Sequence, residues 1–259
     1  MPYCTISGAN LYYETHGSGP AIVFAHGAGG NHLSWYQQVP FFRDRHTCVI
    51  FDHRGFGRSL DARSVEERPR FDEDLAELID QLGLADVRLV AQSMGGWTCL
   101  GYAVTHPERV RALVMADTAG GLTSPELDAV RKEAQERRGN LPLLGGAISQ
   151  GFRERDPRGA FLYEQIFGLN PPREQALGGG TPMNRLSGSV EQSAALRMPV
   201  LFIEGENDLL IPPEVIRVAQ AIIPGARLQM VAGSGHSVYF ERPDEFKRCL
   251  DAFLGETDG

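Results

Sequence analysis

The chain has 259 residues and a formal net charge of −8 at pH 7, with 42% hydrophobic and 22% charged residues. This length and composition are typical of one soluble domain with a modest insert. The negative charge argues against nucleic acid or an anionic membrane as a partner. No apolar run is long enough to span a bilayer, and the N-terminus has neither the basic nor the apolar region of a signal peptide. We therefore expect a cytoplasmic protein, and the sequence carries no signal for an oligomeric state.

The sequence shows no pattern that would bind a metal or a cofactor. Its four cysteines are scattered without metal-ligand spacing and are typical of reduced thiols. A zinc pattern and a phosphate loop are both missing from the sequence. The glycines at Gly27, Gly29 and Gly30 lack the spacing of a dinucleotide loop. We expect a protein that works without a cofactor or a metal.

The first third of the chain alternates strand and helix patterns. Tyr3–Ile6 and Leu11–Glu14 predict an opening hairpin. Ile22–Ala25 and Cys48–Phe51 are apolar runs typical of buried parallel strands. Apolar residues recur through Phe71–Leu82 at the spacing of an amphipathic helix.

The alternation continues after this helix, apart from one segment. Strands are predicted at 87–91, 112–116, 200–203 and 228–231, and helices at 97–103, after 212 and at 244–254. Strict alternation indicates a mostly parallel sheet that helices cover on both faces. Ligands of such sheets bind at the carboxyl ends of the strands.

The segment from Thr118 to Ser193 breaks this alternation. Ser124-Pro125-Glu126 is a helix start, and the following residues to Arg138 are strongly charged. Glycines at 145–146 and 178–180 predict turns or hinges. We interpret the segment as a small helical cap, so that the core is expected at 1–117 and 194–259 and the cap at 118–193.

Ser93 lies at the tip of a predicted strand–turn–helix. The sequence around it is Val90-Ala91-Gln92-Ser93-Met94-Gly95-Gly96. A turn this tight needs small residues two positions before and after the serine, and Gly95 and Ala91 are small, although glycine is usual at the first of these positions. The pattern predicts a nucleophile elbow, in which the start of a helix lies beside the hydroxyl and favours negative charge.

A serine hydroxyl is a weak nucleophile and needs a histidine base and an acid that orients this base. In folds of this kind the partners follow the serine in the order acid, then histidine. The chain has seven histidines, and only His236 follows the predicted acid region. It lies in a glycine-rich loop between a strand and the closing helix, where a catalytic base is well placed.

Asp208 is the preferred acid because it lies furthest past the end of the strand at 200–203. Glu204 and Glu206 in the same loop and Asp117 after the preceding strand are alternatives. For Asp117 and Asp52 we favour a structural role, in which a carboxylate at a strand end accepts hydrogen bonds from loop N–H groups.

Backbone N–H groups of Ala28 and Met94 are expected to form the oxyanion hole. Ala28 follows the strand at 22–25 in the glycine loop His26-Gly27-Ala28-Gly29-Gly30, where the backbone can approach a substrate closely. His26 is expected to brace this loop by hydrogen bonds rather than to act in catalysis.

These residues resemble those of the α/β-hydrolase superfamily over nearly the whole chain. The match includes the His26-Gly27 loop, the Asp52–Ser59 motif, the Ser93 elbow, the acid loop with Asp208, and Gly235-His236. The resemblance implies an α/β-hydrolase fold: a mostly parallel eight-stranded sheet with helices on both faces and a small helical cap. A serine nucleophile argues against the dehalogenases and epoxide hydrolases of this superfamily, which use a carboxylate.

Within the superfamily the sequence is most similar to small bacterial esterases, lactonases and perhydrolases. The expected function is therefore a serine hydrolase that cleaves a small carboxylic ester or lactone through an acyl-enzyme. Trp35, Tyr239 and Phe240, together with Met94, are candidates to border an apolar acyl pocket, and each is equally compatible with core packing.

Three alternative functions remain open from the sequence. Carbon–carbon hydrolases of ring-cleavage pathways use similar machinery, although they usually place an aromatic residue where Ser237 follows the histidine. A perhydrolase without a cofactor is a second alternative. The third comes from another class: a ligand-binding receptor on the same fold that does not catalyse hydrolysis.

Overall fold

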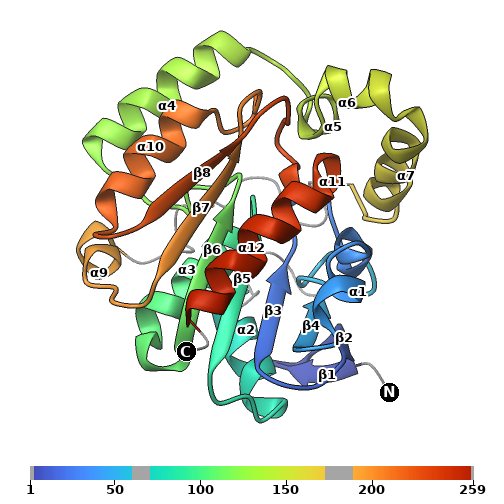
Figure 1. The fold of residues 1–259 in the computed structure, drawn as a ribbon, viewed down its shortest axis with the longest axis vertical. Coiled ribbons are helices and arrows are strands. Elements are labelled where there is room, and N and C mark those ends of the chain that lie inside the picture. Colours follow the sequence, from blue (N-terminus) through green and yellow to red (C-terminus); the bar gives the residue numbers. More distant parts are fainter. Residues whose placement is uncertain (1–2, 60–70, 173–188, 258–259) are drawn as a thin grey trace.

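The computed structural model describes residues 3–59, 71–172 and 189–257. A sheet of eight strands runs through the molecule in the spatial order β1-β2-β4-β3-β5-β6-β7-β8 (Figure 1). β2 pairs antiparallel with β1 and β4, and the later neighbours all pair in parallel. The strands are β1 (Tyr3–Ile6), β2 (Ala9–His16), β3 (Ala21–Ala25), β4 (Thr47–Phe51), β5 (Val87–Gln92), β6 (Val110–Ala116), β7 (Val200–Gly205) and β8 (Arg227–Val231).

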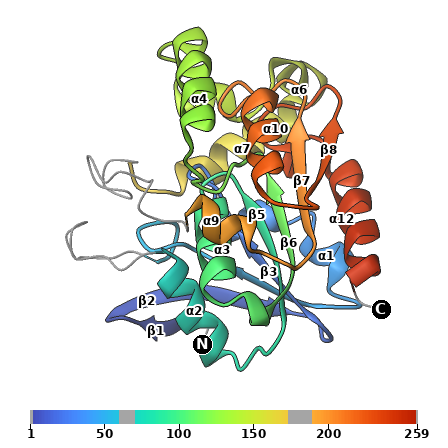
Figure 2. The same ribbon diagram turned by 90° about the vertical axis from the view of Figure 1, so that its left-hand side faces the viewer.

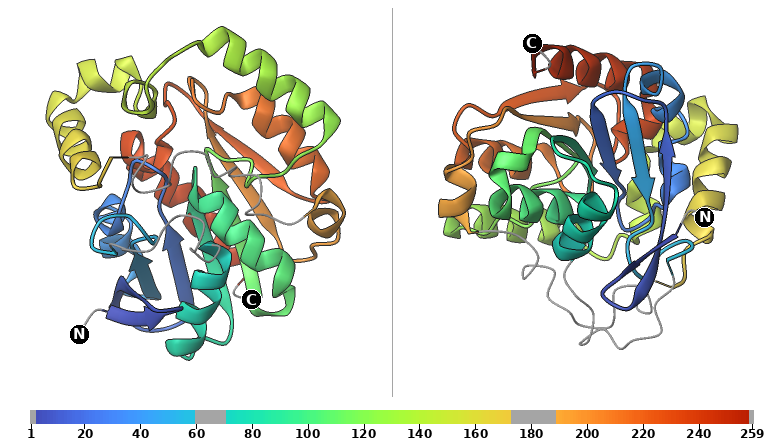
Figure 3. Two further views of the ribbon diagram at one scale, coloured as in Figure 1. Left: turned by 180° about the vertical axis from the view of Figure 1, so that it is seen from behind. Right: turned by 90° about the horizontal axis from the view of Figure 1, so that it is seen from below.

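Helices cover both faces of the sheet, as the second and third views show (Figures 2 and 3). α2 (Phe71–Gln81), α3 (Gly95–Thr105) and α10 (Pro213–Ile222) contribute to one buried core. α1 (Val39–Phe42), α11 (Val238–Glu241) and α12 (Pro243–Thr257) contribute to the core on the opposite face. Short 3-10 helices occur at His32–Trp35 and Pro107–Arg109.

Alternate residues of the central strands supply these two cores. In β3, Val23 belongs to the core with α2 and α3, whereas Ile22 and Phe24 belong to the core under α12. Successive side chains of a strand point to opposite faces, so a strand covered on both faces must be apolar throughout. This is why the sequence of the inner strands is a continuous apolar run rather than an alternating one.

The described residues between β6 and β7 form a set of helices that we call the helical insert. α5, α6 and α7 lie together at one side of the molecule, and α4 lies beside α10 (Figure 1). An ion pair joins Arg137 of α4 to Glu214 of α10. The helices of the insert are α4 (Pro125–Arg138), α5 (Leu143–Ala147), α6 (Gln150–Arg155), α7 (Pro157–Gly168) and α9 (Val190–Ala194).

The predicted strands and long helices are confirmed close to their expected bounds. The opening hairpin is present, and the helix predicted to end at Leu82 ends at Gln81. α11 was missed because a single turn is too short to show a helical period. The glycines at 178–180, predicted to be a turn, lie outside the described residues.

None of the helices in the described ranges has the length and apolar character needed to cross a membrane.

Candidate active site

Ser93 lies between the end of β5 and the start of α3, at the carboxyl end of the sheet. Its φ is 49°, in the left-handed region that residues other than glycine rarely adopt. Such a backbone costs about 1–3 kcal/mol and persists only where the surrounding structure enforces it. Here the enforcing contact is close packing on β3, since a Cβ at Gly95 would overlap the carbonyl group of Ala25. The turn therefore has the geometry of a nucleophile elbow, with Ser93 half-buried.

The structure brings the three residues expected to be catalytic into one chain of hydrogen bonds. Oγ of Ser93 lies 2.8 Å from Nε2 of His236. The other ring nitrogen of His236, Nδ1, lies 2.7 Å from Oδ2 of Asp208. These residues come from three separate loops at the carboxyl ends of β5, β8 and β7. The order is that of a nucleophile, a base and an acid that orients the base.

Asp208 is held in place by the backbone of its own loop. Its Oδ1 accepts hydrogen bonds from the N–H groups of Leu210 at 2.7 Å and Ile211 at 3.0 Å. Its second oxygen is thereby left for His236. Glu206, the nearest alternative in sequence, is exposed and instead accepts a hydrogen bond from the Gly233 N–H.

Asp117 has the structural role that the sequence favoured. It is fully buried at the end of β6, and its two oxygens accept hydrogen bonds from the N–H groups of Gly205 and Val238, both at 3.1 Å. These bonds connect the end of β6 to the end of β7 and to α11. Burial and the charge of Asp208 raise the pKa of Asp117 well above its ordinary value. Asp52 likewise accepts hydrogen bonds from loop N–H groups, those of His32 and Arg58.

Glu204 is the third acid of this region, and it lies fully buried on β7. Neither of its oxygens has a hydrogen-bond partner in the described part of the chain. Burial, together with the charges of Asp208 and Asp117, raises the pKa of Glu204 well above its ordinary value. A buried carboxyl group without donors is stabilised by keeping its proton.

Asp117, Glu204 and Asp208 each have one oxygen within 4.8 Å of the others, which is the geometry of a cation site. Most of their oxygens are already used, however. Asp117 binds two N–H groups, and Asp208 binds two N–H groups and a histidine. The cluster is therefore explained as part of the acid loop, and it gives no reason to assign a metal.

The loop after β3 lies directly against the nucleophile. A Cβ at Gly27 would collide with the side chain of Gln92 and lie 2.9 Å from Cβ of Ser93. Among the hydrogen bonds of the described residues, none has the N–H of Ala28 or Met94 as its donor. Met94 follows Ser93 directly, and Ala28 follows Gly27, which packs against Ser93, so both N–H groups stay candidates for an oxyanion hole.

His26 braces this loop, as the sequence predicted. The N–H of His53 donates to Nε2 of His26 at 3.0 Å, and Nδ1 of His26 donates to the carbonyl of Gly27 at 2.8 Å. Complete burial lowers the pKa of His26 to about 4. The ring therefore stays neutral at physiological pH and fixes the position of the glycine loop.

A cavity of about 10 Å³ lies beside Ser93, which is close to the room needed for one water molecule. Its lining joins the oxyanion loop and the catalytic residues to the helical insert. The lining residues are Ala28, Gly29, Gln92, Ser93, Leu143, Ala147, Tyr163 and His236.

Trp35, Tyr239 and Phe240, expected as candidates to border the acyl pocket, do not line this cavity. Each is at most 3% exposed. The ring of Trp35 packs on Tyr239 with centroids 4.9 Å apart, and Phe240 packs on Tyr163. The structure places these three rings in the core on the α12 side of the sheet.

The sequence did not single out the insert residues at the cavity. Leu143 and Tyr163 belong to two apolar patches of the sequence, 141–144 and 161–163, which are compatible with lining a pocket or with packing on the core, and nothing in these patches shows which side chain faces Ser93. Their positions depend on how α5 and α7 pack over the sheet. Two side-chain amides seat part of the insert: Asn31 donates to the carbonyl of Ile166 at 2.9 Å, and Asn170 to that of Gly29 at 3.2 Å.

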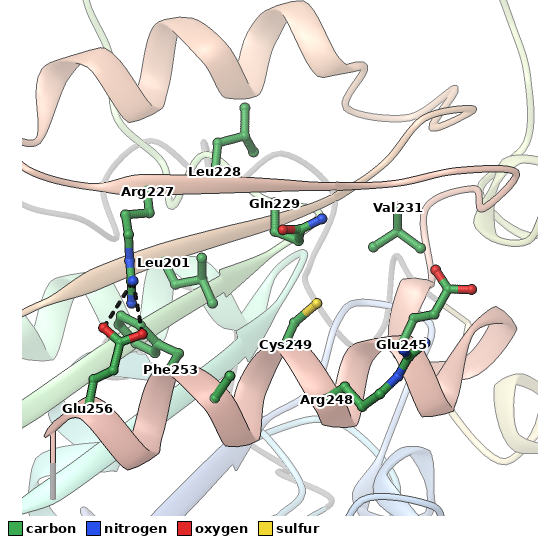
Figure 4. Close-up of a pocket in the computed structure, with 11 residues that line it drawn as sticks. Leu201, Arg227, Leu228, Gln229, Val231, Glu245, Arg248, Cys249, Phe253 and Glu256 are labelled. Carbon is green, nitrogen blue, oxygen red and sulfur yellow. Dashed lines mark hydrogen bonds and ion pairs between the residues drawn. The ribbon is translucent and has the colours of Figure 1, made fainter.

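A larger hollow of about 550 Å³ lies between β8 and α12 (Figure 4) and shares no lining residue with the cavity beside Ser93. An ion pair of Arg227 with Glu256 lies at one end of it. Its walls are the side chains of an edge strand and a surface helix, and it contains no nucleophile–base pair. The hydrogen-bonded chain at Ser93, and not the volume of a hollow, is therefore what marks the candidate active site.

A family model described as the alpha/beta hydrolase fold matches residues 20–243. The chain belongs to the α/β-hydrolase family. It is an enzyme of this family.

Named relatives align with at least 96% of the chain. RutD of Azorhizobium caulinodans, whose proposed activity is carbamate hydrolysis, is 30% identical, and the alignment covers 100% of both chains. Among solved structures, a thermophilic esterase from Thermogutta terrifontis has a TM-score of 0.79 and 25% identity, covering 96% of this chain and 94% of the esterase. Est816, an enzyme that degrades N-acyl homoserine lactones, has a TM-score of 0.78 and 26% identity, with 97% and 100% covered.

Proposed function

We propose that this α/β-hydrolase is a serine hydrolase that cleaves a small carboxylic ester or lactone through an acyl-enzyme intermediate. The observation that supports this most is the continuous hydrogen-bonded chain from Ser93 Oγ through His236 to Asp208, with contacts of 2.8 and 2.7 Å. Distances of this size allow a proton to pass from the serine to the histidine as the serine attacks.

In the proposed mechanism, Oγ of Ser93 attacks the carbonyl carbon while Nε2 of His236 takes its proton. Asp208 accepts the hydrogen bond from Nδ1, so it fixes the tautomer of the imidazole and stabilises the imidazolium. The N–H groups of Ala28 and Met94 bind the oxyanion, and each lowers the barrier by roughly 3 kcal/mol. The imidazolium then protonates the leaving alcohol.

Water completes the cycle. His236 removes a proton from a water molecule that attacks the acyl-enzyme, and the second tetrahedral intermediate uses the same two N–H groups. Collapse of this intermediate returns the proton to Ser93 and releases the carboxylic acid. Each of these steps uses only the side chains and backbone groups described above.

The lining of the cavity beside Ser93 supports a substrate with an uncharged acyl group. The cavity holds about 10 Å³ and is lined mainly by apolar and uncharged groups, so charge on the acyl part is not favoured. The relatives add lactones and esters as substrate classes, through Est816 and the Thermogutta esterase, and carbamates through RutD. A first panel of p-nitrophenyl esters, acyl lactones and aryl carbamates of graded length covers these classes.

Replacing Ser93 with alanine tests the mechanism. We expect Ser93→Ala to lower kcat on the best substrate of the panel by at least about 10⁴-fold, because the nucleophile is lost while the fold remains. Ser18→Ala is the matched control: Ser18 is exposed and far from the site in sequence, and turnover should be unchanged. Wild-type turnover by Ser93→Ala would exclude an acyl-enzyme on this serine.

A fluorophosphonate probe separates an enzyme from a receptor on the same fold. Such probes phosphonylate only an activated serine, so we expect one label on the wild-type protein and none on Ser93→Ala. If intact wild-type protein took no label, the receptor interpretation would replace the proposed hydrolase. If the protein took the label but hydrolysed no ester, lactone or carbamate, the carbon–carbon and perhydrolase alternatives would be tested next.

A further inference from the structure

The carboxylate of Glu241 lies buried, 3% exposed, in the short helix α11 that follows the histidine loop. Its Oε1 accepts hydrogen bonds from the N–H groups of Ser149 at 2.9 Å and Gly235 at 3.1 Å. Its Oε2 accepts a hydrogen bond from the Ser149 hydroxyl at 2.5 Å. One side chain of the core thus holds both the helical insert and the residue that precedes His236.

On the insert side, Glu241 binds both ends of helix α6. Ser149 is the N-cap of α6, and its hydroxyl also accepts a hydrogen bond from the Phe152 N–H at 3.1 Å. At the other end of the helix, Arg155 donates to the backbone carbonyl of Glu241 at 3.2 Å. α6 is therefore fixed to one residue of the core at its first and last turn.

The residues before and after His236 both take part in hydrogen bonds that connect the histidine loop to the insert. Gly235 shares Oε1 of Glu241 with Ser149, and the hydroxyl of Ser237 lies 3.1 Å from that of Tyr163 on α7. The packing is so close that a Cβ at Gly235 would lie 2.9 Å both from the side-chain Oε1 of Glu241 and from the backbone nitrogen of Ser149. The position of the imidazole is thus tied to the position of the insert.

The insert also closes the cavity beside Ser93. Leu143, Ala147 and Tyr163 line that cavity, and its volume of about 10 Å³ leaves no room for an ester with a leaving group. The insert must move outward to admit a substrate and return before the reaction. Any such movement displaces Ser149 and therefore disturbs its hydrogen bonds to Glu241.

We propose that Glu241 is a positioning residue that couples the seating of the helical insert to the placement of the His236 imidazole, so that the base is in place when the insert is closed over the substrate. This proposal rests on the proposed function only for its kinetic readouts. Glu241 touches neither Ser93 nor the imidazole, and it acts through Gly235 and Ser149.

Among the described residues, the surroundings of Glu241 contain one cation and two other acidic groups. The charge of Arg155 on α6 lowers the pKa of Glu241. The charge of Glu241 in turn raises the pKa values of Asp117, after β6, and of Tyr163, on α7. Burial raises the pKa of Glu241, and the hydrogen bonds from Ser149 and Gly235 oppose that rise. The donors surrounding the carboxylate thus offset part of the cost of burying it.

The first experiment compares Glu241→Ala with Glu241→Gln. The amide of glutamine can still accept from the two N–H groups and can donate to the Ser149 hydroxyl, so we expect it to retain at least a third of the wild-type kcat. Alanine breaks the link, and we expect kcat to fall 10- to 100-fold with KM changed less than threefold. The rate of labelling by a small fluorophosphonate should fall in the same proportion as kcat.

A second readout does not depend on any substrate. The proton on Nδ1 of a histidine that is bonded to a carboxylate gives a far-downfield proton NMR signal, which His236→Gln would identify here by its loss. We expect this signal in the wild type and in Glu241→Gln, and a broadened or missing signal in Glu241→Ala. If no substrate were hydrolysed but the NMR signals followed this pattern, the inference would stand. If substrate were hydrolysed but the signal of Glu241→Ala matched that of the wild type, the inference alone would be overturned.

Ser149→Ala and Ser124→Ala form a matched pair of variants. Both serines cap a helix of the insert, α6 and α4, but only Ser149 binds Glu241. We expect Ser149→Ala to lower kcat two- to fivefold and Ser124→Ala to leave it unchanged. Combining Ser149→Ala with Glu241→Ala should cost no more than Glu241→Ala alone, because both changes cut the same link.

Two results would contradict the proposal. One is a Glu241→Ala protein with wild-type kcat, labelling rate and NMR signal but a lower melting temperature, which would make Glu241 a residue of stability only. The other is an equal loss in Ser149→Ala and Ser124→Ala, which would reflect helix capping. If Glu241→Ala did not fold, the serine pair and Glu241→Gln would still decide between these outcomes.

Discussion

Asp208 and Asp117 follow neighbouring strands of the same sheet, are both buried, and both accept hydrogen bonds from two backbone N–H groups. They differ in how these bonds are distributed. Asp208 receives both on Oδ1 and turns Oδ2 to His236, whereas Asp117 uses one oxygen for Gly205 and the other for Val238. Asp208 therefore has one oxygen left to pair with a base, and Asp117 has none.

Asp208→Asn is the variant with the largest expected effect. The asparagine oxygen can still bind Leu210 and Ile211, but its NH₂ group then faces Nδ1 of His236. The imidazole would have to carry its proton on Nε2, where it can no longer take one from Ser93. We expect kcat to fall about 10³- to 10⁴-fold with little change in stability, as measured by steady-state kinetics and urea unfolding.

Glu206→Gln is the control for this prediction, because Glu206 was the nearest alternative acid. It is exposed and points to Gly233, so its replacement should change kcat less than about threefold, an effect below 1 kcal/mol. A larger loss from Glu206→Gln than from Asp208→Asn would reassign the acid.

Asp117→Asn should affect stability more than chemistry. Asparagine tolerates the left-handed φ of 52° at this position, so the backbone is preserved. Its NH₂ group, however, must face one of the two N–H donors, and that donor loses its acceptor. We expect a loss of about 1–3 kcal/mol in the free energy of unfolding and a decrease in kcat of less than about tenfold. A loss of kcat as large as that of Asp208→Asn, without loss of stability, would contradict the division of roles.

The effect of Glu204→Gln is expected in the pH dependence of stability rather than in kcat. Burial raises the pKa of Glu204 above its ordinary value of 4.5, so the folded protein holds this proton more tightly than the unfolded chain. The contribution of Glu204 to stability is therefore complete below pH 4.5 and declines as the pH rises toward the folded-state pKa.

Glutamine is neutral at every pH and removes this decline. The stability difference between Glu204→Gln and the wild type should therefore grow from pH 5 to pH 8 in favour of the variant, by at most about 1.4 kcal/mol per pH unit within that window. Urea unfolding at several pH values measures this difference. A difference that stays constant with pH would show that Glu204 is ionised in the folded protein.

Much of the fold could be predicted from local sequence, because it depends on short-range patterns. The apolar runs of β3 and β5 and the period of α2 specify buried strands and a covering helix. α11, with its single turn, shows no period, and it carries Glu241. In the insert, α5 and α6 are too short to show a period, and α7 was visible in the sequence only as an apolar patch.

The sequence by itself determined the chemistry that the site can offer: a serine in a tight turn, a single histidine after the acid region, and acids at a strand end. The structure decided how these groups are used. Which acid faces His236, which N–H groups are free, and which rings belong to the core all depend on contacts between residues far apart in the chain. Such contacts arise from the packing of strands, loops and insert, and local spacing does not encode them.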